Sequence, residues 1–226
     1  GELSREITPE ISRALRDLTL LAQLAAPRAV FVGPARLPPV VAYVDAYFDD
    51  LDHSGLGAAH FDPLHANVEA IWDHITREVH AQFAERLHYS GIGELWVVFI
   101  YLVEFGAQLV DRDLLFFGDN IGVLAQLIRG STPPVDAEHL ATLILLLFQV
   151  LRIRPWFEYV ESPSNPVDGL SRDGAEDTLA QDLGWRVRQA QRPSWSPKEH
   201  HYEVLRRLVP PGLLLPIILR GRGGSH

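Results

Sequence analysis

Three carboxylate residues stand within or directly beside apolar segments and a fourth lies in a segment rich in Ser and Pro, and together they constrain the fold more than any other feature of the sequence. Asp45 interrupts the run VVAYVDAYF, and Glu94 opens a long apolar segment. Asp119 follows the run LLFFG, and Asp168 lies within SPSNPVDGLSR. An isolated buried carboxylate is costly unless a cation or another partner compensates its charge. Four such residues on separate elements therefore indicate a site for divalent metal ions.

The pattern of apolar residues predicts an α/β fold. The predicted strands are 40–48, 56–61, 68–75, 114–118 and 156–160. The predicted helices are 4–25, 76–87, 94–109, 120–129 and 135–151. Among the strands, helices connect only the third to the fourth and the fourth to the fifth, so we expect three antiparallel strands followed by two parallel ones. Strand 114–118 is apolar enough to predict a central position with both faces covered.

This order of elements predicts where the four acids lie. Asp45 and Asp119 fall on strands that we expect to be neighbours. Glu94 falls at the start of the helix that would pack on those strands, and Asp168 follows the last strand by a short loop. The four side chains are therefore expected to converge.

The segments around the acids resemble the ribonuclease H domain of reverse transcriptases of the retroelement type, a group that includes LTR, DIRS and hepadnavirus-like elements. The matching segments, in order, are AYVDAYF, GELW, FGDN and NPVDGLSR. The resemblance covers about residues 8–175 and implies a ribonuclease H-like fold, a five-stranded mixed sheet flanked by helices. Tyr47 and Phe48 depart from the pattern, because those domains more often carry a small Ser after the first acid.

The resemblance also implies a chemistry and a set of site residues. The catalytic and metal-binding residues would be Asp45, Glu94, Asp119 and Asp168, which would hold two Mg²⁺ ions, with Mn²⁺ as a substitute. Mg²⁺ prefers hard oxygen ligands, as carboxylates provide. Asn120 and Arg172 would bind substrate, although Asn120 is also well placed to cap a helix. The expected activity is an endonuclease that hydrolyses the RNA strand of an RNA–DNA hybrid, with a reverse transcriptase polymerase domain upstream.

Charge and composition suggest three parts, namely a helix and connector over 1–39, a ribonuclease H-like domain over 40–175 and a basic extension over 176–226. Residues 183–226 carry eight basic and two acidic residues, a balance of +6, whereas the whole chain has a net charge of −9. Trp185, Trp195 and Tyr202 alternate with arginines there. Such residues can grip nucleic acid or cover apolar surface, and both interpretations stay open at this point.

The composition excludes some classes of protein. Cysteine is absent, which removes disulfides and thiolate zinc sites. The apolar stretches 140–151 and 213–219 are shorter than the roughly 20 residues that a membrane span needs. The chain opens with Gly and closes with GRGGSH, so we expect a piece excised from a larger protein.

Two alternatives accompany the nuclease hypothesis. The first is a catalytically silent scaffold of the same fold, which binds nucleic acid or protein within a larger assembly. Four intact metal ligands argue against it, whereas Tyr47 and Phe48 and the net acidity favour it. The second is a relative that cuts DNA, such as a transposase or resolvase core, and the segment NPVDGLSR argues against that.

Overall fold

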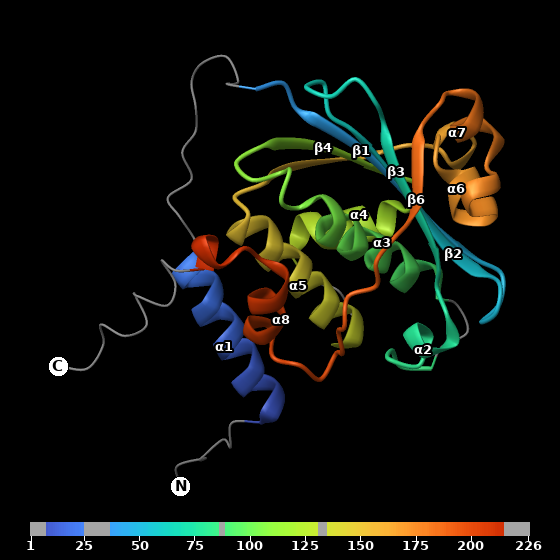
Figure 1. Ribbon diagram of the computed structural model, residues 1–226. Coiled ribbons are helices and arrows are strands. Elements are labelled where there is room, and N and C mark those ends of the chain that lie inside the picture. Colours follow the sequence, from blue (N-terminus) through green and yellow to red (C-terminus); the bar gives the residue numbers. More distant parts are fainter. Residues whose placement is uncertain (1–7, 25–36, 86–88, 131–134, 215–226) are drawn as a thin grey trace, which may run out of the picture.

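The computed structural model describes residues 8–24, 37–85, 89–130 and 135–214. They form an α/β fold around a mixed sheet with the strand order β5-β4-β1-β2-β3-β6 (Figure 1). The strands are β1 (Val40–Phe48), β2 (Ser54–Phe61), β3 (Glu69–His74), β4 (Asp113–Gly118), β5 (Arg154–Tyr159) and β6 (Arg186–Gln189). The first three strands pair in antiparallel fashion, and β4 and β5 run parallel to β1. The predicted class and strand directions are therefore confirmed.

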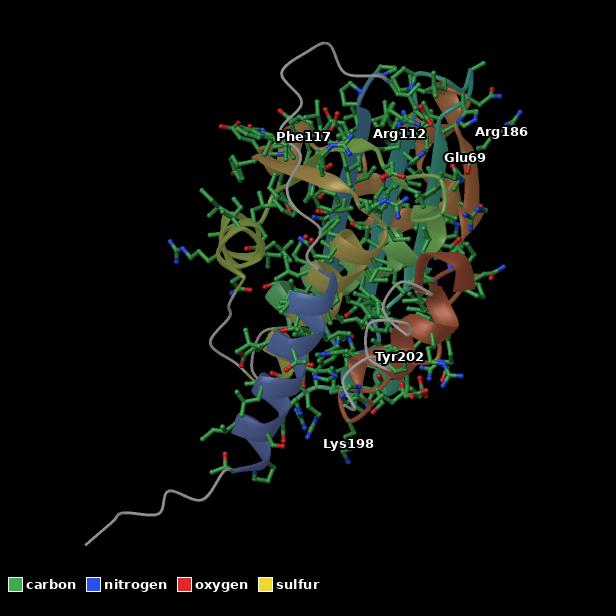
Figure 2. All side chains as sticks on the ribbon, turned by 90° about the vertical axis from the view of Figure 1, so that its left-hand side faces the viewer. Glu69, Arg112, Phe117, Arg186, Lys198 and Tyr202 are labelled. Atoms are coloured by element: carbon green, nitrogen blue, oxygen red, sulfur yellow. The ribbon has the colours of Figure 1, made fainter. Side chains whose placement is uncertain are left out.

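The sixth strand lies outside the five that the sequence predicts. β6 comes from the segment expected to be a basic extension, and it pairs in parallel with β3 at the edge of the sheet. The register places Arg186 opposite Glu69, and Figure 2 shows these two residues at the same edge. A strand that reads RVRQ has one apolar residue and hence no detectable periodicity. The expectation of a five-stranded sheet is corrected to six strands for this reason.

Helices in two layers cover one face of the sheet. They are α3 (Ser90–Phe105), α4 (Ile121–Arg129) and α5 (Val135–Val150), with α1 (Pro9–Leu24) and α8 (His201–Leu208) beyond α5 (Figure 1). α3 packs directly on β1 and β2, and α5 packs behind α3. The main hydrophobic core lies between these layers. A polar side chain on the sheet-facing side of α3 is therefore held between a buried helix and the central strands.

α3 begins four residues before the predicted start, so Glu94 lies one turn inside the helix. The first turn of α3 lies close to β1, and Gly93 permits this packing, because a Cβ at Gly93 would lie 3.3 Å from the Cβ of Ala46. Burial of nearly the whole helix outweighs the low helix propensity of the segment SGIG.

A smaller layer covers the opposite face, over β2, β3 and β6. It consists of α6 (Asp168–Asp173), the 3₁₀ turn η2 (Gly174–Glu176) and α7 (Thr178–Asp182), and the 3₁₀ turn η1 (Ser162–Ser164) precedes it. α6 lies so close to β2 that a Cβ at Gly55 would fall 2.1 Å from the carbonyl oxygen of Ser171. Asp168 follows β5 by a short segment, as expected, and is the first residue of α6, for which the two β2 glycines, Gly55 and Gly57, provide a flat surface.

Two local expectations are wrong. The segment 76–87, predicted to be one helix, contains a single helical turn, α2 (Arg77–His80). The end of the predicted helix, from residue 86, lies outside the described residues. β4 is central, but only alternate residues are fully buried, because α6 and α7 lie over the other half of the sheet and leave this face half open. The apolar sequence of this strand therefore predicted more burial than β4 has in the structure.

The tail packs on the body of the protein. Trp195 is 5% exposed and contacts the rings of Phe83, Trp96 and Phe99. Most of its described arginines bind carboxylates, in the pairs Arg188–Glu104, Arg192–Asp73, Arg206–Glu203 and Arg207–Glu199. These contacts favour the interpretation in which the tail covers apolar surface. Arg220 and Arg222 lie outside the described residues.

Candidate metal centre

Strand pairing brings the first two acids together. β1 and β4 are parallel neighbours, and their printed register ends with Tyr43 opposite Phe117. Carrying this register two residues further places Asp45 opposite Asp119, just past the end of β4. The predicted adjacency of these two acids is therefore confirmed.

The third acid comes from α3, which lies against β1. The carboxylate of Glu94 accepts a hydrogen bond from the backbone N–H of Ala46, with an N–O distance of 3.3 Å. This bond connects the helix to the strand residue next to Asp45. Glu94 is buried, and its side chain points toward the same point as Asp45 and Asp119.

Asp45, Glu94 and Asp119 each offer a carboxylate oxygen, and these oxygens all lie within 4.8 Å of one another. Within the described ranges, this is the only group of three or more His, Asp or Glu side chains with such spacing. Asp45 and Glu94 are buried, whereas Asp119 is half-buried. The group therefore has an open side at Asp119, and its ligands suit a hard divalent cation.

Burial and mutual repulsion shift the protonation of this group. Burial, together with the charges of Asp119 and Asp168, raises the pKa of Asp45 to about 7, against a hydrogen bond from Ser171 that lowers it. Burial also raises the pKa of Glu94 well above its usual value, with contributions from Asp45 and Asp119. A cation between the carboxylates would reverse both shifts, since an opposite charge favours the ionised form.

Asp168 is the one predicted ligand that lies outside this group. Its charge reaches Asp45, but its carboxylate forms an ion pair with Arg172 one turn along α6, at 3.0 Å. The guanidinium carbon of Arg172 also lies 4.4 Å from the centroid of the Tyr47 ring. The structure thus brings three of the four acids together, and ligation by Asp168 stays a prediction.

Asn120 caps a helix. Its side-chain oxygen accepts a hydrogen bond from the N–H of Val123 at 3.2 Å, at the start of α4. The expected cap is therefore present, and a contact with substrate stays a prediction. Of the two residues that depart from the family pattern, Phe48 packs against His80 and Tyr89, while Tyr47 carries the Arg172 contact described above.

Three polar residues support the centre without having been singled out from the sequence. Ser171 donates a hydrogen bond to Asp45, and Ser162 donates one to Asp119. Asn165 donates one to the carbonyl oxygen of Val44 at 2.9 Å, which fixes the segment before α6 against β1. Ser171 and Asn165 belong to NPVDGLSR, so the motif contained a signal for them, whereas nothing in the sequence pointed to Ser162.

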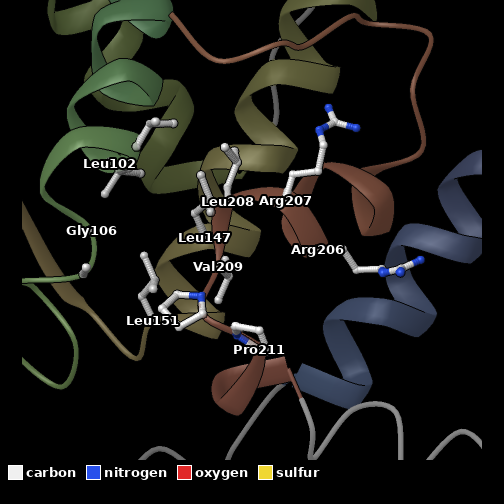
Figure 3. Close-up of a pocket in the computed structure, with 12 residues that line it drawn as sticks. Leu102, Gly106, Leu147, Leu151, Arg206, Arg207, Leu208, Val209 and Pro211 are labelled. Atoms are coloured by element: carbon white, nitrogen blue, oxygen red, sulfur yellow. The ribbon is translucent and has the colours of Figure 1, made fainter. Parts of the chain in front are cut away.

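A hollow lies at the end of α3 that is away from Glu94, between α3, α5 and the end of α8 (Figure 3). Leucine, valine and proline side chains line most of it. Its two arginines, Arg206 and Arg207, pair with Glu203 and Glu199. It therefore lacks the polar groups that would make it a second chemical site.

Comparison with known proteins adds a fold likeness only. No protein-family model matches the chain, and no curated protein matches it. One similar structure is ribonuclease H1 of the halophilic archaeon Halobacterium salinarum, at 19% identity over 62% of this chain and 100% of that one, with a TM-score of 0.46. Another is the N-terminal ribonuclease H domain of Rv2228c from Mycobacterium tuberculosis, at 18% identity over 64% and 97%, with a TM-score of 0.41. A third is the ribonuclease H1 LC11 isolated from compost, at 15% identity over 61% and 97%, with a TM-score of 0.43. These similarities are too distant to assign an activity to this chain.

Proposed function

We propose that this protein is a metal-dependent endonuclease of the ribonuclease H type, which hydrolyses phosphodiester bonds. The observation that carries the proposal is the convergence of Asp45, Glu94 and Asp119 from two parallel strands and a buried helix. Buried acids with raised pKa values and no compensating cation are costly to a fold. Such a cost is typical of a functional site.

The proposed cofactor is a pair of Mg²⁺ ions, for which Mn²⁺ would substitute. Asp45 would contact both ions, Glu94 and Asp119 would complete one site, and Asp168 would complete the other. When bound, the ions would supply a water nucleophile at neutral pH and neutralise charge on the leaving oxygen. Ser171 and the backbone of Ala46 would hold Asp45 and Glu94 in place through the hydrogen bonds that they already form.

The proposed substrate is the RNA strand of an RNA–DNA hybrid, cut to leave 3′-hydroxyl and 5′-phosphate ends. Support comes from the sequence resemblance and from where its motifs lie. Asp119 of FGDN and Ser171 of NPVDGLSR both lie at the centre, the first as a ligand candidate and the second bonded to Asp45. We propose further that the domain follows the polymerase of a retroelement-type reverse transcriptase.

One observation favours the alternative of a silent scaffold. The fourth acid, Asp168, is already neutralised by Arg172, so the described structure presents three of the four ligands. A scaffold would retain this arrangement without cutting nucleic acid. The two functions differ in metal binding as well as in cleavage.

The test is cleavage of a labelled RNA–DNA hybrid in Mg²⁺ or Mn²⁺, beside double-stranded DNA and double-stranded RNA. Asp119→Asn removes a ligand, and Asp113→Asn is the matched control, because Asp113 lies at the other end of β4 and pairs with Arg154, away from the three acids. We expect the RNA strand to be cut, with a loss of at least about 100-fold in Asp119→Asn, since metal stabilisation of the transition state is worth several kcal/mol. Asp113→Asn should keep its activity.

Each other result changes the conclusion. Cleavage of duplex DNA in place of the hybrid would favour a transposase-like relative. If no substrate is cut and calorimetry detects no Mn²⁺ binding, the scaffold hypothesis replaces the nuclease hypothesis. Measuring Mn²⁺ binding separates this outcome from an active site that needs a polymerase domain for substrate affinity.

A further inference from the structure

Arg172 engages Asp168 through two parallel contacts. Its Nε donates to one carboxylate oxygen at 3.1 Å, and its Nη2 donates to the other at 3.0 Å. The guanidinium also lies over the ring of Tyr47, with its central carbon 4.4 Å from the ring centroid. Arginine prefers this combination of a bidentate carboxylate and an aromatic face. Arg172 thus holds Asp168 directly, and Tyr47, a residue that departs from the family pattern, holds the guanidinium of Arg172.

The backbone of α6 is fixed close to the three acids. Ser171 donates a hydrogen bond to Asp45, and Gly57 lies so near α6 that a Cβ there would be 2.7 Å from the N of Ser171. Asp168 therefore starts one helical turn from a residue that touches the centre. Its carboxylate nevertheless stays outside the group of Asp45, Glu94 and Asp119, while Arg172 holds both of its oxygens.

We propose that Arg172 and Tyr47 form a latch that withholds Asp168 from metal ligation. With the latch closed, the chain binds one divalent ion tightly through Asp45, Glu94 and Asp119. A second ion binds only when Arg172 releases Asp168. Arg172 is a positioning residue in this proposal, which rests on the proposed function because it assumes that the three acids bind a metal.

The strength of the latch suits a reversible device. The side chains of Arg172 and Asp168 are 48% and 34% exposed, so solvent screens their attraction. An exposed pair of this kind changes an equilibrium by about twofold to fivefold. The positive charge of Arg172 also opposes a second cation nearby. Removal of the guanidinium should therefore strengthen the second site by at least about fivefold.

Isothermal titration of the whole chain with Mn²⁺ tests the latch without relying on activity. We compare wild type with Arg172→Gln and with Tyr47→Ser, which removes only the ring. The matched control is Arg154→Gln, because Arg154 and Asp113 form an ion pair of similar exposure, 46% and 38%, away from the centre. We expect second-site affinity to rise about fivefold in Arg172→Gln and about twofold in Tyr47→Ser, and to stay unchanged in Arg154→Gln.

A double-mutant cycle with Asp168→Asn decides whether the effect passes through Asp168. If Arg172 acts as a latch, Arg172→Gln strengthens the second site only while Asp168 is present. A gain that persists in the Asp168→Asn background would show a general charge effect and overturn the latch, as would no gain in Arg172→Gln. Failure of wild type to bind any Mn²⁺, or equal binding by Asp119→Asn, would overturn the proposed function itself.

Discussion

The strand side and the helix side of the candidate metal centre hold their acids differently. The strand side is formed by β1, the end of β4 and the helix α3 that packs on them. Its acids, Asp45, Glu94 and Asp119, each offer a carboxylate oxygen within 4.8 Å of the others, and they form no ion pair with any residue that the structure describes. On the helix side, Asp168 is more exposed and pairs with Arg172. A fold selected for stability alone would place the arginine beside the buried acids, where an unpaired charge costs the most free energy.

This difference suggests separate roles for the two sides. The strand side resembles a preorganised ligand set, because hydrogen bonds from the backbone of Ala46 and from Ser171 orient its acids before any ion arrives. The helix side, formed by α6, resembles an adjustable ligand, since Asp168 can pair either with a metal ion or with Arg172 on the same helix. The predictions below test whether this division holds, beginning with the largest expected effect.

Gly57→Ala should destabilise the packing of α6, which carries Asp168, against the strands of the sheet. The added Cβ would lie 2.7 Å from the N of Ser171 and 2.9 Å from the carbonyl oxygen of Val167, and both are backbone atoms. We expect the free energy of unfolding to fall by about 3 kcal/mol, because overpacking against backbone forces α6 to move. Gly91→Ala is the control, since no atom lies within 4 Å of a Cβ there. Equal urea midpoints for the two variants would contradict close packing of α6 on β2.

Asp45→Asn should stabilise the metal-free protein at pH 8. The pKa of Asp45 is about 7 in the folded chain, against an ordinary value of 3.8. The folded chain therefore binds the extra proton between these values, and its free energy of unfolding falls as the pH rises from about 4 to about 7. A shift of this size corresponds to about 4 kcal/mol. Replacing the carboxylate by an amide should recover about half of it at pH 8, because Asn accepts a weaker hydrogen bond from Ser171. Urea unfolding at several pH values measures this, and a variant less stable than wild type at pH 8 would contradict it.

Two serines allow a matched comparison of the hydrogen bonds to the acids. Ser171→Ala removes a buried donor to Asp45, whereas Ser162→Ala removes an exposed donor to Asp119. We expect losses of about 1.5 kcal/mol and less than about 0.5 kcal/mol in the free energy of unfolding, because water replaces only the exposed donor. Chemical denaturation measures both. Equal losses would mean that Asp45 is more hydrated than its burial indicates.

Asn120→Ala should cost about 1 kcal/mol of stability, since it removes the cap of α4 directly after Asp119. Asn120→Ser preserves a capping oxygen and should stay near wild type. If Asn120 also contacts substrate, the Ser variant will keep its unfolding midpoint but bind the hybrid more weakly. Binding measured in Ca²⁺ would reveal this second role, and unchanged affinity would restrict Asn120 to the cap.

The sequence by itself determined the elements whose signals are local. The β-branched and aromatic run over 40–48 predicted β1 within its observed bounds, and Gly130, with a φ of 70°, ended α4 where expected. The placement of Asp45 and Asp119 on neighbouring strands followed from helices between parallel strands, which is also a local pattern. Apolar periodicity and chain direction were sufficient for these features.

Only the tertiary structure decided which distant segments became partners. Nothing in RVRQ indicated that it would add a strand beside β3, and the proximity of Arg172 to Asp168 in sequence did not reveal that Tyr47 would pack on the guanidinium. The same holds for Trp195, for which the sequence left both contact with nucleic acid and packing on the body open. Such choices depend on the free energy of burial and charge pairing summed over the whole fold, so short segments carry no record of them.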